Sequence, residues 1–128
     1  MENEKIKDFK DLIVWQEGHQ LVIQVYKLTK SFPREELYSL SDQIKRAVSS
    51  VTSNIAEGFG RHTYKEKIQF YYQAQGSLIE VKNQLIIAKD VGFVGLNEFD
   101  ILYSQANKVH SLLQGLIRKS KTFLIHKS

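Results

Sequence analysis

Hydrophobic residues recur every three or four positions over most of the chain, which is the spacing of an amphipathic α-helix. Four such stretches predict helices over residues 12–31, 35–57, 63–91 and 97–120. No strand-like alternation of useful length competes with them. Because the connections are short, consecutive helices are expected to be antiparallel. The pattern predicts an all-α fold, an antiparallel up-down-up-down four-helix bundle that forms a single domain over residues 1–128.

Each predicted helix carries one apolar stripe that is expected to face the core. The first stripe comprises Trp15, His19, Val22, Tyr26 and Thr29, flanked by Val14, Leu21, Val25 and Leu28. The second comprises Leu37, Leu40, Ile44, Ala47, Val51 and Ile55. The third comprises Tyr71, Ala74, Leu78, Val81, Leu85 and Ala88. The fourth comprises Phe99, Leu102, Ala106, Val109, Leu113 and Leu116.

Local signals mark the helix ends. Pro33 ends the first helix, because the residue before a proline disfavours helical backbone angles. The Gly58-Phe59-Gly60 run ends the second helix, since glycine permits the backbone of a C-terminal cap. Thr63 and Glu66 have the spacing of a capping box, and Asn97 is the expected N-cap of the fourth helix.

The composition supports long helices and excludes several kinds of chemistry. There is one proline in 128 residues, and proline breaks helix interiors. There is no cysteine, which excludes disulfides, a cysteine zinc site and thiol catalysis. No apolar run approaches the roughly 18 residues of a membrane span, and the N-terminus does not have the pattern of a signal peptide. We therefore expect a cytoplasmic protein that makes no membrane contact.

The net charge of +4 is unevenly spread along the chain. Residues 108–128 contain five Lys and Arg residues and no Asp or Glu, whereas residues 18–107 are nearly balanced. One interpretation is favourable charge at a helix C-terminus together with a solvated tail. The other is a patch that attracts polyanions. The charge by itself favours the first interpretation.

The polar side of the second predicted helix forms a continuous stripe. Its members recur at spacings of three and four: Gln43, Arg46, Ser50, Asn54 and Glu57. Serine and asparagine are mediocre helix formers, so their concentration here indicates close packing or specific hydrogen bonds. In the third helix, Gly76 is expected to permit close helix approach and Glu80 to face Arg46. A structural polar network is the preferred interpretation, and a ligand or nucleic-acid site is the alternative.

The turn from Glu57 to Thr63 contains two glycines, Arg61 and His62. With the free N–H groups of a helix start, it could hold a phosphate. The preferred interpretation is a helix–helix corner in which Phe59 packs and Arg61 binds carbonyl groups or Glu57. The turn is not a P-loop, because it lacks the Gly-Lys-Ser/Thr ending and the preceding strand.

Nothing in the sequence indicates catalysis. The four histidines, His19, His62, His110 and His126, form neither a HExxH nor an ExxH arrangement. His19 is expected to pack at the edge of the core, and no serine is marked as a nucleophile. We therefore expect no enzyme activity, catalytic residue, metal or cofactor.

Several motifs along the chain resemble a known family. They are the run from Val48 to Arg61, the Leu12-to-Gln16 segment, the Phe32-to-Glu36 segment, and Gly76-Ser77-Leu78 with Glu80. They are similar to bacterial four-helix bundle proteins first noticed as reading frames in intervening sequences of 23S ribosomal RNA genes. The chain departs from the family pattern at Thr52, where proline is frequent, and at Tyr38-Ser39-Leu40.

The resemblance implies a homo-oligomer, specifically a pentamer. It also implies a distant similarity to the accessory variability determinant of diversity-generating retroelements, which binds nucleic acid and a reverse transcriptase. The leading hypothesis is therefore an accessory module that binds RNA or DNA. The candidate phosphate contacts are Arg61, Lys65, Lys67, Lys108, Arg118, Lys119 and Lys121.

Two neighbouring tyrosines lie in the third predicted helix. Tyr71 and Tyr72 could stack on bases, but packing is the preferred interpretation for tyrosines in a bundle helix.

The alternative function is a protein-interaction scaffold without a nucleic-acid role. In that case the polar stripe and the basic end of the chain are subunit contacts.

Overall fold

The structure is a computed structural model that describes residues 6–36 and 39–127. These residues form four long α-helices and two short 3₁₀ turns, and none of them lies in a strand. In chain order the elements are η2 (Phe9–Asp11), α1 (Ile13–Thr29), η3 (Arg34–Glu36), α2 (Leu40–Phe59), α3 (Tyr64–Asp90) and α4 (Leu96–Lys127). The predicted all-α fold is confirmed. No helix in the described part of the chain is long and apolar enough to span a bilayer.

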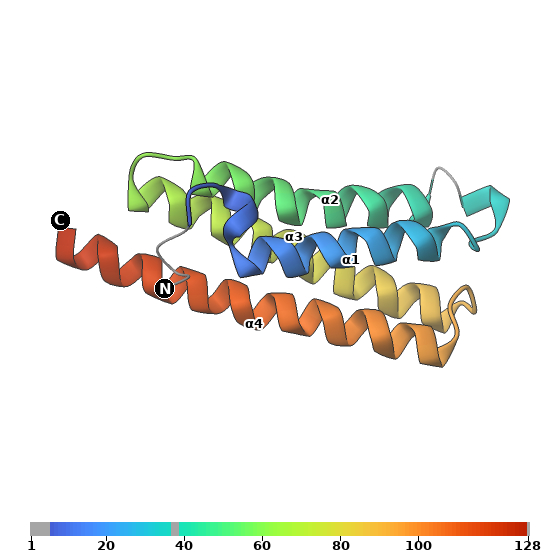
Figure 1. The fold of residues 1–128 in the computed structure, drawn as a ribbon. Helices are drawn as coiled ribbons and strands as arrows, with labels where there is room; N and C mark the ends of the chain where they lie inside the picture. Colours follow the sequence, from blue (N-terminus) through green and yellow to red (C-terminus); the bar gives the residue numbers. More distant parts are fainter. Residues whose placement is uncertain (1–5, 37–38, 128) are drawn as a thin grey trace.

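The helices run up and down along a common axis (Figure 1). Contacts between α3 and α4 give their relative direction: Lys121 lies over the ring of Tyr72 near one end, and Lys89 lies over Phe99 near the other. The late residues of one helix therefore meet the early residues of the next. The same reversed order joins Gly18 to Thr52 and Tyr26 to Ser49 across α1 and α2, and Gly58 to Tyr71 and Ser50 to Ser77 across α2 and α3.

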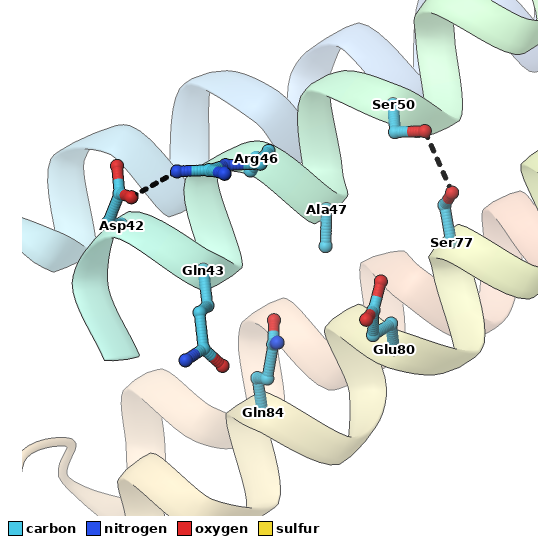
Figure 2. A pocket seen from close by; sticks show the side chains of 8 residues that line it. All are labelled: Asp42, Gln43, Arg46, Ala47, Ser50, Ser77, Glu80 and Gln84. Carbon is cyan, nitrogen blue, oxygen red and sulfur yellow. Dashed lines mark hydrogen bonds and ion pairs between the residues drawn. The ribbon is translucent and has the colours of Figure 1, made fainter. Parts of the chain in front are cut away.

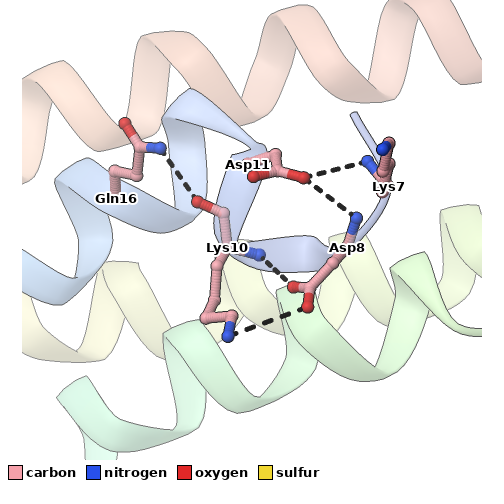
Figure 3. A network of polar contacts seen from close by, with 5 residues as sticks. All are labelled: Lys7, Asp8, Lys10, Asp11 and Gln16. Atoms are coloured by element: carbon pink, nitrogen blue, oxygen red, sulfur yellow. Dashed lines mark hydrogen bonds and ion pairs between the residues drawn. The ribbon is translucent and has the colours of Figure 1, made fainter. Parts of the chain in front are cut away.

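A short polar network orders the chain in front of α1 (Figure 3). The side chain of Asp8 accepts from the Lys10 backbone N–H at 2.8 Å, and that of Asp11 accepts from the Asp8 N–H at 3.2 Å. Gln16 on the first turn of α1 donates to the Lys10 carbonyl at 2.8 Å. These reciprocal bonds form a capping box, so both carboxylates are used in holding η2.

The start of α2 differs from the predicted boundary. The helix was expected from residue 35, but it begins at Leu40, and Arg34–Glu36 forms η3 instead. The chain has to reverse direction after α1, and the residues following Pro33 are used for that reversal. The acidic residue in the first turn of α2 is Asp42, whose carboxylate interacts favourably with the helix dipole. The predicted core residue Leu37 and the departure at Tyr38 lie outside the described residues.

Helix α4 is longer than predicted at both ends. The Phe99 N–H donates to the carbonyl of Gly95 at 2.9 Å, so the helix begins before Asn97, and the prediction of Asn97 as the N-cap is wrong. At the other end α4 continues to Lys127 rather than stopping at residue 120. No glycine or proline follows Gly115 to end it, and Phe123 stacks on Tyr64 of α3 at 5.1 Å.

The predicted core stripes of α3 and α4 are confirmed, as is the described part of the α2 stripe, with Phe99 and Leu116 partly buried. The α1 stripe is displaced by one position. The apolar core residues of α1 are those that were expected to flank the stripe: Val14, Leu21, Val25 and Leu28. Of the predicted stripe, Thr29 is buried as expected. Both series have helical spacing, so the sequence does not distinguish them. Trp15 is partly buried and stacks on the exposed His19, with ring centroids 4.8 Å apart.

Close helix approach occurs at glycines other than the expected one. A Cβ on Gly76 would meet no atom of the described residues within 4 Å, so the expected role of Gly76 in the close approach of helices within the bundle is wrong. A Cβ on Gly58 would lie 2.7 Å from the ring of Tyr71 and 3.0 Å from Phe70. Gly58 therefore sets the separation of α2 and α3. Gly18 likewise sets the separation of α1 and α2, because a Cβ on Gly18 would lie 3.1 Å from the methyl group of Thr52.

This difference predicts opposite effects of two alanine substitutions. Gly58→Ala should lower the free energy of unfolding by about 1–3 kcal/mol, because the new methyl group overlaps a buried ring. Gly76→Ala should raise it by up to about 1 kcal/mol, because alanine is the better helix former and the site is open. Urea denaturation of both variants tests this. Equal stability of the two variants would contradict the packing described here.

Candidate functional site

One end of the bundle collects most of the candidate phosphate contacts. The turn between α2 and α3 and the last turns of α4 lie at the same end of the molecule (Figure 1). The stacking of Tyr64 on Phe123 and the position of Lys121 over Tyr72 at 5.1 Å join these segments. We call this region the basic end, and its cations are Arg61, Lys65, Lys67, Arg118, Lys119 and Lys121.

Two cations of the basic end are used in building the helix corner. Arg61 forms an ion pair with Glu57 at 2.7 Å, and its guanidinium lies 4.6 Å from the centre of the Phe70 ring. The Lys67 ammonium donates to the Phe59 carbonyl at 2.6 Å, and burial lowers the pKa of Lys67. These contacts match the corner interpretation of the turn, because both side chains bind groups of the chain itself.

The remaining cations of the basic end are exposed: Lys65, Arg118, Lys119 and Lys121. None of them contacts a carboxylate in the part of the chain that the structure describes. Arg118 and Lys121 border an open groove of about 310 Å³ between α3 and α4, which Tyr72, Gln75 and Gln114 also line. The side chain of Tyr72 is 43% exposed there, so the groove offers cations, amides and an aromatic ring together.

Lys108 lies away from the basic end and has a different partner. Its ammonium is 3.4 Å from the carboxylate of Glu17 on α1. Gln105 donates to the same carboxylate at 2.9 Å, and this hydrogen bond, together with Lys108, lowers the pKa of Glu17. Lys108 therefore connects α4 to α1.

The polar stripe of α2 divides into separate contacts. The Asn54 amide donates to the Ser50 carbonyl at 2.9 Å and to its hydroxyl at 3.0 Å. The Ser77 hydroxyl of α3 donates to the same Ser50 oxygen at 2.9 Å. Glu57 pairs with Arg61 as described above. Ser50 is therefore the residue through which the stripe contacts α3.

Arg46 does not form the expected pair with Glu80. Its guanidinium pairs with Asp42, one turn earlier on the same helix. Within the described residues, no side-chain hydrogen bond or ion pair reaches the Glu80 carboxylate. Figure 2 shows Glu80 and Gln84 pointing from α3 toward α2 across an open groove of about 540 Å³. The polar residues of this α2–α3 groove are Asp42, Gln43, Arg46, Ser50, Ser77, Glu80 and Gln84.

Some residues of these surfaces were not predicted from the sequence. Asp42 was missed as the partner of Arg46, although its i,i+4 spacing on a helix is a recognisable signal. Gln84 was missed because it stands within the apolar register of α3 between Val81 and Ala88, where a lone amide gives no motif. The signal that could have identified Gln84 is a polar residue at the three- and four-residue spacing of the buried positions of α3.

Comparison with known proteins gives the family. The sequence matches the 23S rRNA-intervening sequence proteins over residues 10–115. The chain belongs to this family. The resemblance identified in the sequence is therefore confirmed. The α2–α3 groove lies within the matched region, whereas Arg118, Lys119 and Lys121 follow it.

A solved structure shares the fold. It is the 1.70 Å crystal structure of a protein of unknown function from the S23 ribosomal protein family of Bacteroides thetaiotaomicron VPI-5482. The two chains are 18% identical with a TM-score of 0.77, and the alignment covers 82% of this chain and 98% of the other. At this identity the likeness concerns the fold. No curated protein is significantly similar to the sequence.

A lysine–histidine pair joins α3 to α4 near the middle of the bundle of this family member. The Lys82 ammonium donates to Nδ1 of His110 at 2.8 Å and lies 5.9 Å from the centre of the Tyr103 ring. Burial, and then the charge of Lys82, lowers the pKa of His110. A protonated imidazole cannot accept this hydrogen bond, so acid breaks the contact.

This pair predicts a pH dependence of stability. The unfolded chain binds a proton at the ordinary histidine pKa of about 6.5, and the folded chain binds it only at lower pH. The free energy of unfolding should therefore decrease as the pH falls from about 7 to about 5.5. His110→Gln should flatten this dependence, and His19→Gln, at an exposed position, should not. Urea denaturation at several pH values tests this. An unchanged slope for His110→Gln would contradict the assignment.

Proposed function

We propose that this family member is a cytoplasmic, homo-oligomeric accessory protein that binds RNA or DNA through its basic end and is not an enzyme. The observation that carries the proposal is the convergence of exposed cations that contact no carboxylate of the described residues. Lys65 from α3 and three cations from α4 lie at one end, and residues 108–127 contain no acid to neutralise them. Contacts of this kind bind the phosphate backbone irrespective of sequence.

The two neighbouring tyrosines of α3 have different roles in the proposal. Tyr71 is 2% exposed, and burial raises its pKa to about 12, so it belongs to the core. Tyr72 is exposed in the groove beside Arg118 and Lys121. An aromatic ring next to cations supports stacking on a base of a single strand. Base stacking is therefore assigned to Tyr72 alone.

Arg61, Lys67 and Lys108 have secondary parts in this function. Arg61 and Lys67 stabilise the corner, and Lys108 pairs with Glu17. To contact a phosphate directly, each of these side chains would have to give up its contact within the protein. They contribute to the electrostatic attraction rather than to direct phosphate contacts. A partner such as a reverse transcriptase, implied by the resemblance, stays a prediction.

The proposal predicts a specific loss of salt-sensitive binding. Replacing Arg118, Lys119 and Lys121 together by glutamine should weaken binding of a single-stranded RNA or DNA oligonucleotide and lower the slope of log K against log salt by about 2. The matched control replaces Lys27, Lys30 and Arg34, which are exposed at the opposite end of the bundle. It removes the same charge and should leave most of the binding.

Fluorescence anisotropy over a salt series measures both variants. If the wild-type protein does not bind at about 50 mM salt, the nucleic-acid proposal fails. If the control loses as much affinity as the basic-end variant, binding depends on net charge and not on this surface.

A second candidate function is a protein-interaction scaffold, and the exposed face of α3 favours it. Tyr72, Ile79 and Ile86 recur at intervals of seven residues and are 43%, 52% and 36% exposed. Gly76 lies on the same face, where its missing side chain leaves the helix backbone open to a neighbour. An apolar helix face of this kind is typical of a helix–helix contact between copies.

The scaffold function predicts that a charge on this face prevents assembly. Ile79→Glu should reduce the mass measured by light scattering to that of a monomer, because a carboxylate cannot be buried unpaired in the interface. Ile101→Glu on α4, where the side chain is 54% exposed, is the control and should retain the wild-type mass. An Ile79→Glu variant of wild-type mass would show that this face is not the contact.

A further inference from the structure

A second cationic surface lies at the end of the bundle opposite the basic end, where the chain passes from α1 to α2 (Figure 1). A groove of about 390 Å³ is bordered there by the last turn of α1, the residues up to η3 and the first turns of α2. We call it the α1–α2 corner groove. Its cations are Lys30, Arg34 and Lys45, and Tyr26 is its exposed aromatic residue.

The cations of the corner groove are not neutralised by the chain. None of them contacts a carboxylate of the described residues, and no acid is among the described residues that line the groove. Asp42, the acid nearest to Lys45 along α2, pairs with Arg46 instead. Like charges that share a small volume repel one another, and an anion that binds between them relieves this repulsion. The charge of the groove therefore favours an anion.

Capping of α1 does not account for this gathering of cations. The last carbonyls of the helix, those of Lys27, Leu28 and Thr29, each accept a hydrogen bond from the backbone N–H three residues later. The helix dipole favours a cation at a helix C-terminus, which explains Lys30. Lys45 lies near the N-terminal end of α2, where the dipole gives a cation no advantage. A shared ligand explains both positions.

The charged ends of these side chains are accessible to a ligand. Lys30 and Arg34 are exposed, and Lys45 is half-buried with its ammonium 5.6 Å from the centre of the Tyr26 ring. Lysine and arginine have flexible stems, so the three charged groups can move to meet one anion in the groove. The Tyr26 side chain is 45% exposed and presents an aromatic surface beside them.

The set of donors matches a phosphate monoester. Such a group carries about 1.5 to 2 negative charges at neutral pH and has three strong acceptor oxygens. An arginine guanidinium binds two phosphate oxygens at once, and a lysine ammonium adds a compact positive charge. A lone carboxylate has two oxygens and one charge, so it would leave more of the positive charge uncompensated.

We propose that the α1–α2 corner groove binds the phosphate group of a small phosphomonoester. Arg34 donates two hydrogen bonds to the phosphate, Lys30 and Lys45 donate one each, and the organic part of the ligand lies against the Tyr26 ring. The volume of about 390 Å³ is within the range of small-molecule sites. The groove is separate from the basic end, so the proposal does not depend on nucleic-acid binding.

The test uses the full-length protein, without nucleic acid, and phenyl phosphate as the probe. At about pH 8 and about 50 mM salt, the probe is a dianion and its attraction to the groove is only partly screened. Isothermal titration calorimetry should detect binding, and NMR should show a shift of the Tyr26 ring signals. Benzoate has the same ring with one charge, so it should bind at least about tenfold more weakly.

Two matched variants connect the signal to the groove. Lys45→Gln removes one of the three cations and should weaken phenyl phosphate binding by about tenfold, which corresponds to the loss of one charged hydrogen bond. Lys89→Gln is the control. Lys89 is also half-buried and lies over an aromatic ring, that of Phe99 at 4.5 Å, but it is outside the groove. This variant should bind phenyl phosphate like the wild-type protein.

Three results would overturn the proposal. They are no binding of phenyl phosphate to the wild-type protein, equal binding of benzoate, and equal losses in Lys45→Gln and Lys89→Gln. The variant with three glutamines at the basic end should bind phenyl phosphate normally. The variant at Lys27, Lys30 and Arg34 should lose this binding and retain most of the nucleic-acid binding, so failure of one proposal is distinguishable from failure of the other.

Discussion

The close contact of α2 with α3 at Gly58 is the constraint on which the other surfaces depend. Tyr71 is buried where any side chain on residue 58 would lie, so the two helices approach at their shared corner. Farther from the corner, Ser50 lies opposite Ser77 at hydrogen-bond distance, and the α2–α3 groove follows these two residues. The same corner determines where α3 starts, and hence which turns of α4 it meets.

The charged residues divide into those that hold the fold and those that remain available. Arg61, Lys67 and Lys108 bind acceptors or carboxylates of the chain and connect neighbouring segments. Arg118 and Lys121 have no such partner among the described residues and border an open groove. This division is physically reasonable, because a cation can be desolvated at low cost only when an acceptor compensates for the lost water. Availability for a polyanion therefore follows from the absence of an internal acceptor.

The two candidate surfaces relate differently to the family. The α2–α3 groove is formed by residues within the region matched to the 23S rRNA-intervening sequence proteins. The cations of α4 at the basic end follow residue 115, where the match stops. The region matched to the family therefore contains the α2–α3 groove and not the cations of α4 at the basic end.

The sequence determined the helices and most of the core, because apolar spacing and helix-ending residues act locally. It also identified the family through motifs along α2 and α3. It could not choose the buried register of α1, since Trp15 and Val14 begin series with the same helical spacing. Tertiary structure decided that choice. It also decided that Arg46 binds Asp42, that Gly76 is open, and that the side-chain oxygen of Gln84 has no donor among the described residues. Each of these outcomes depends on which residues of other helices stand opposite, and that is set by packing in three dimensions rather than by neighbours along the chain.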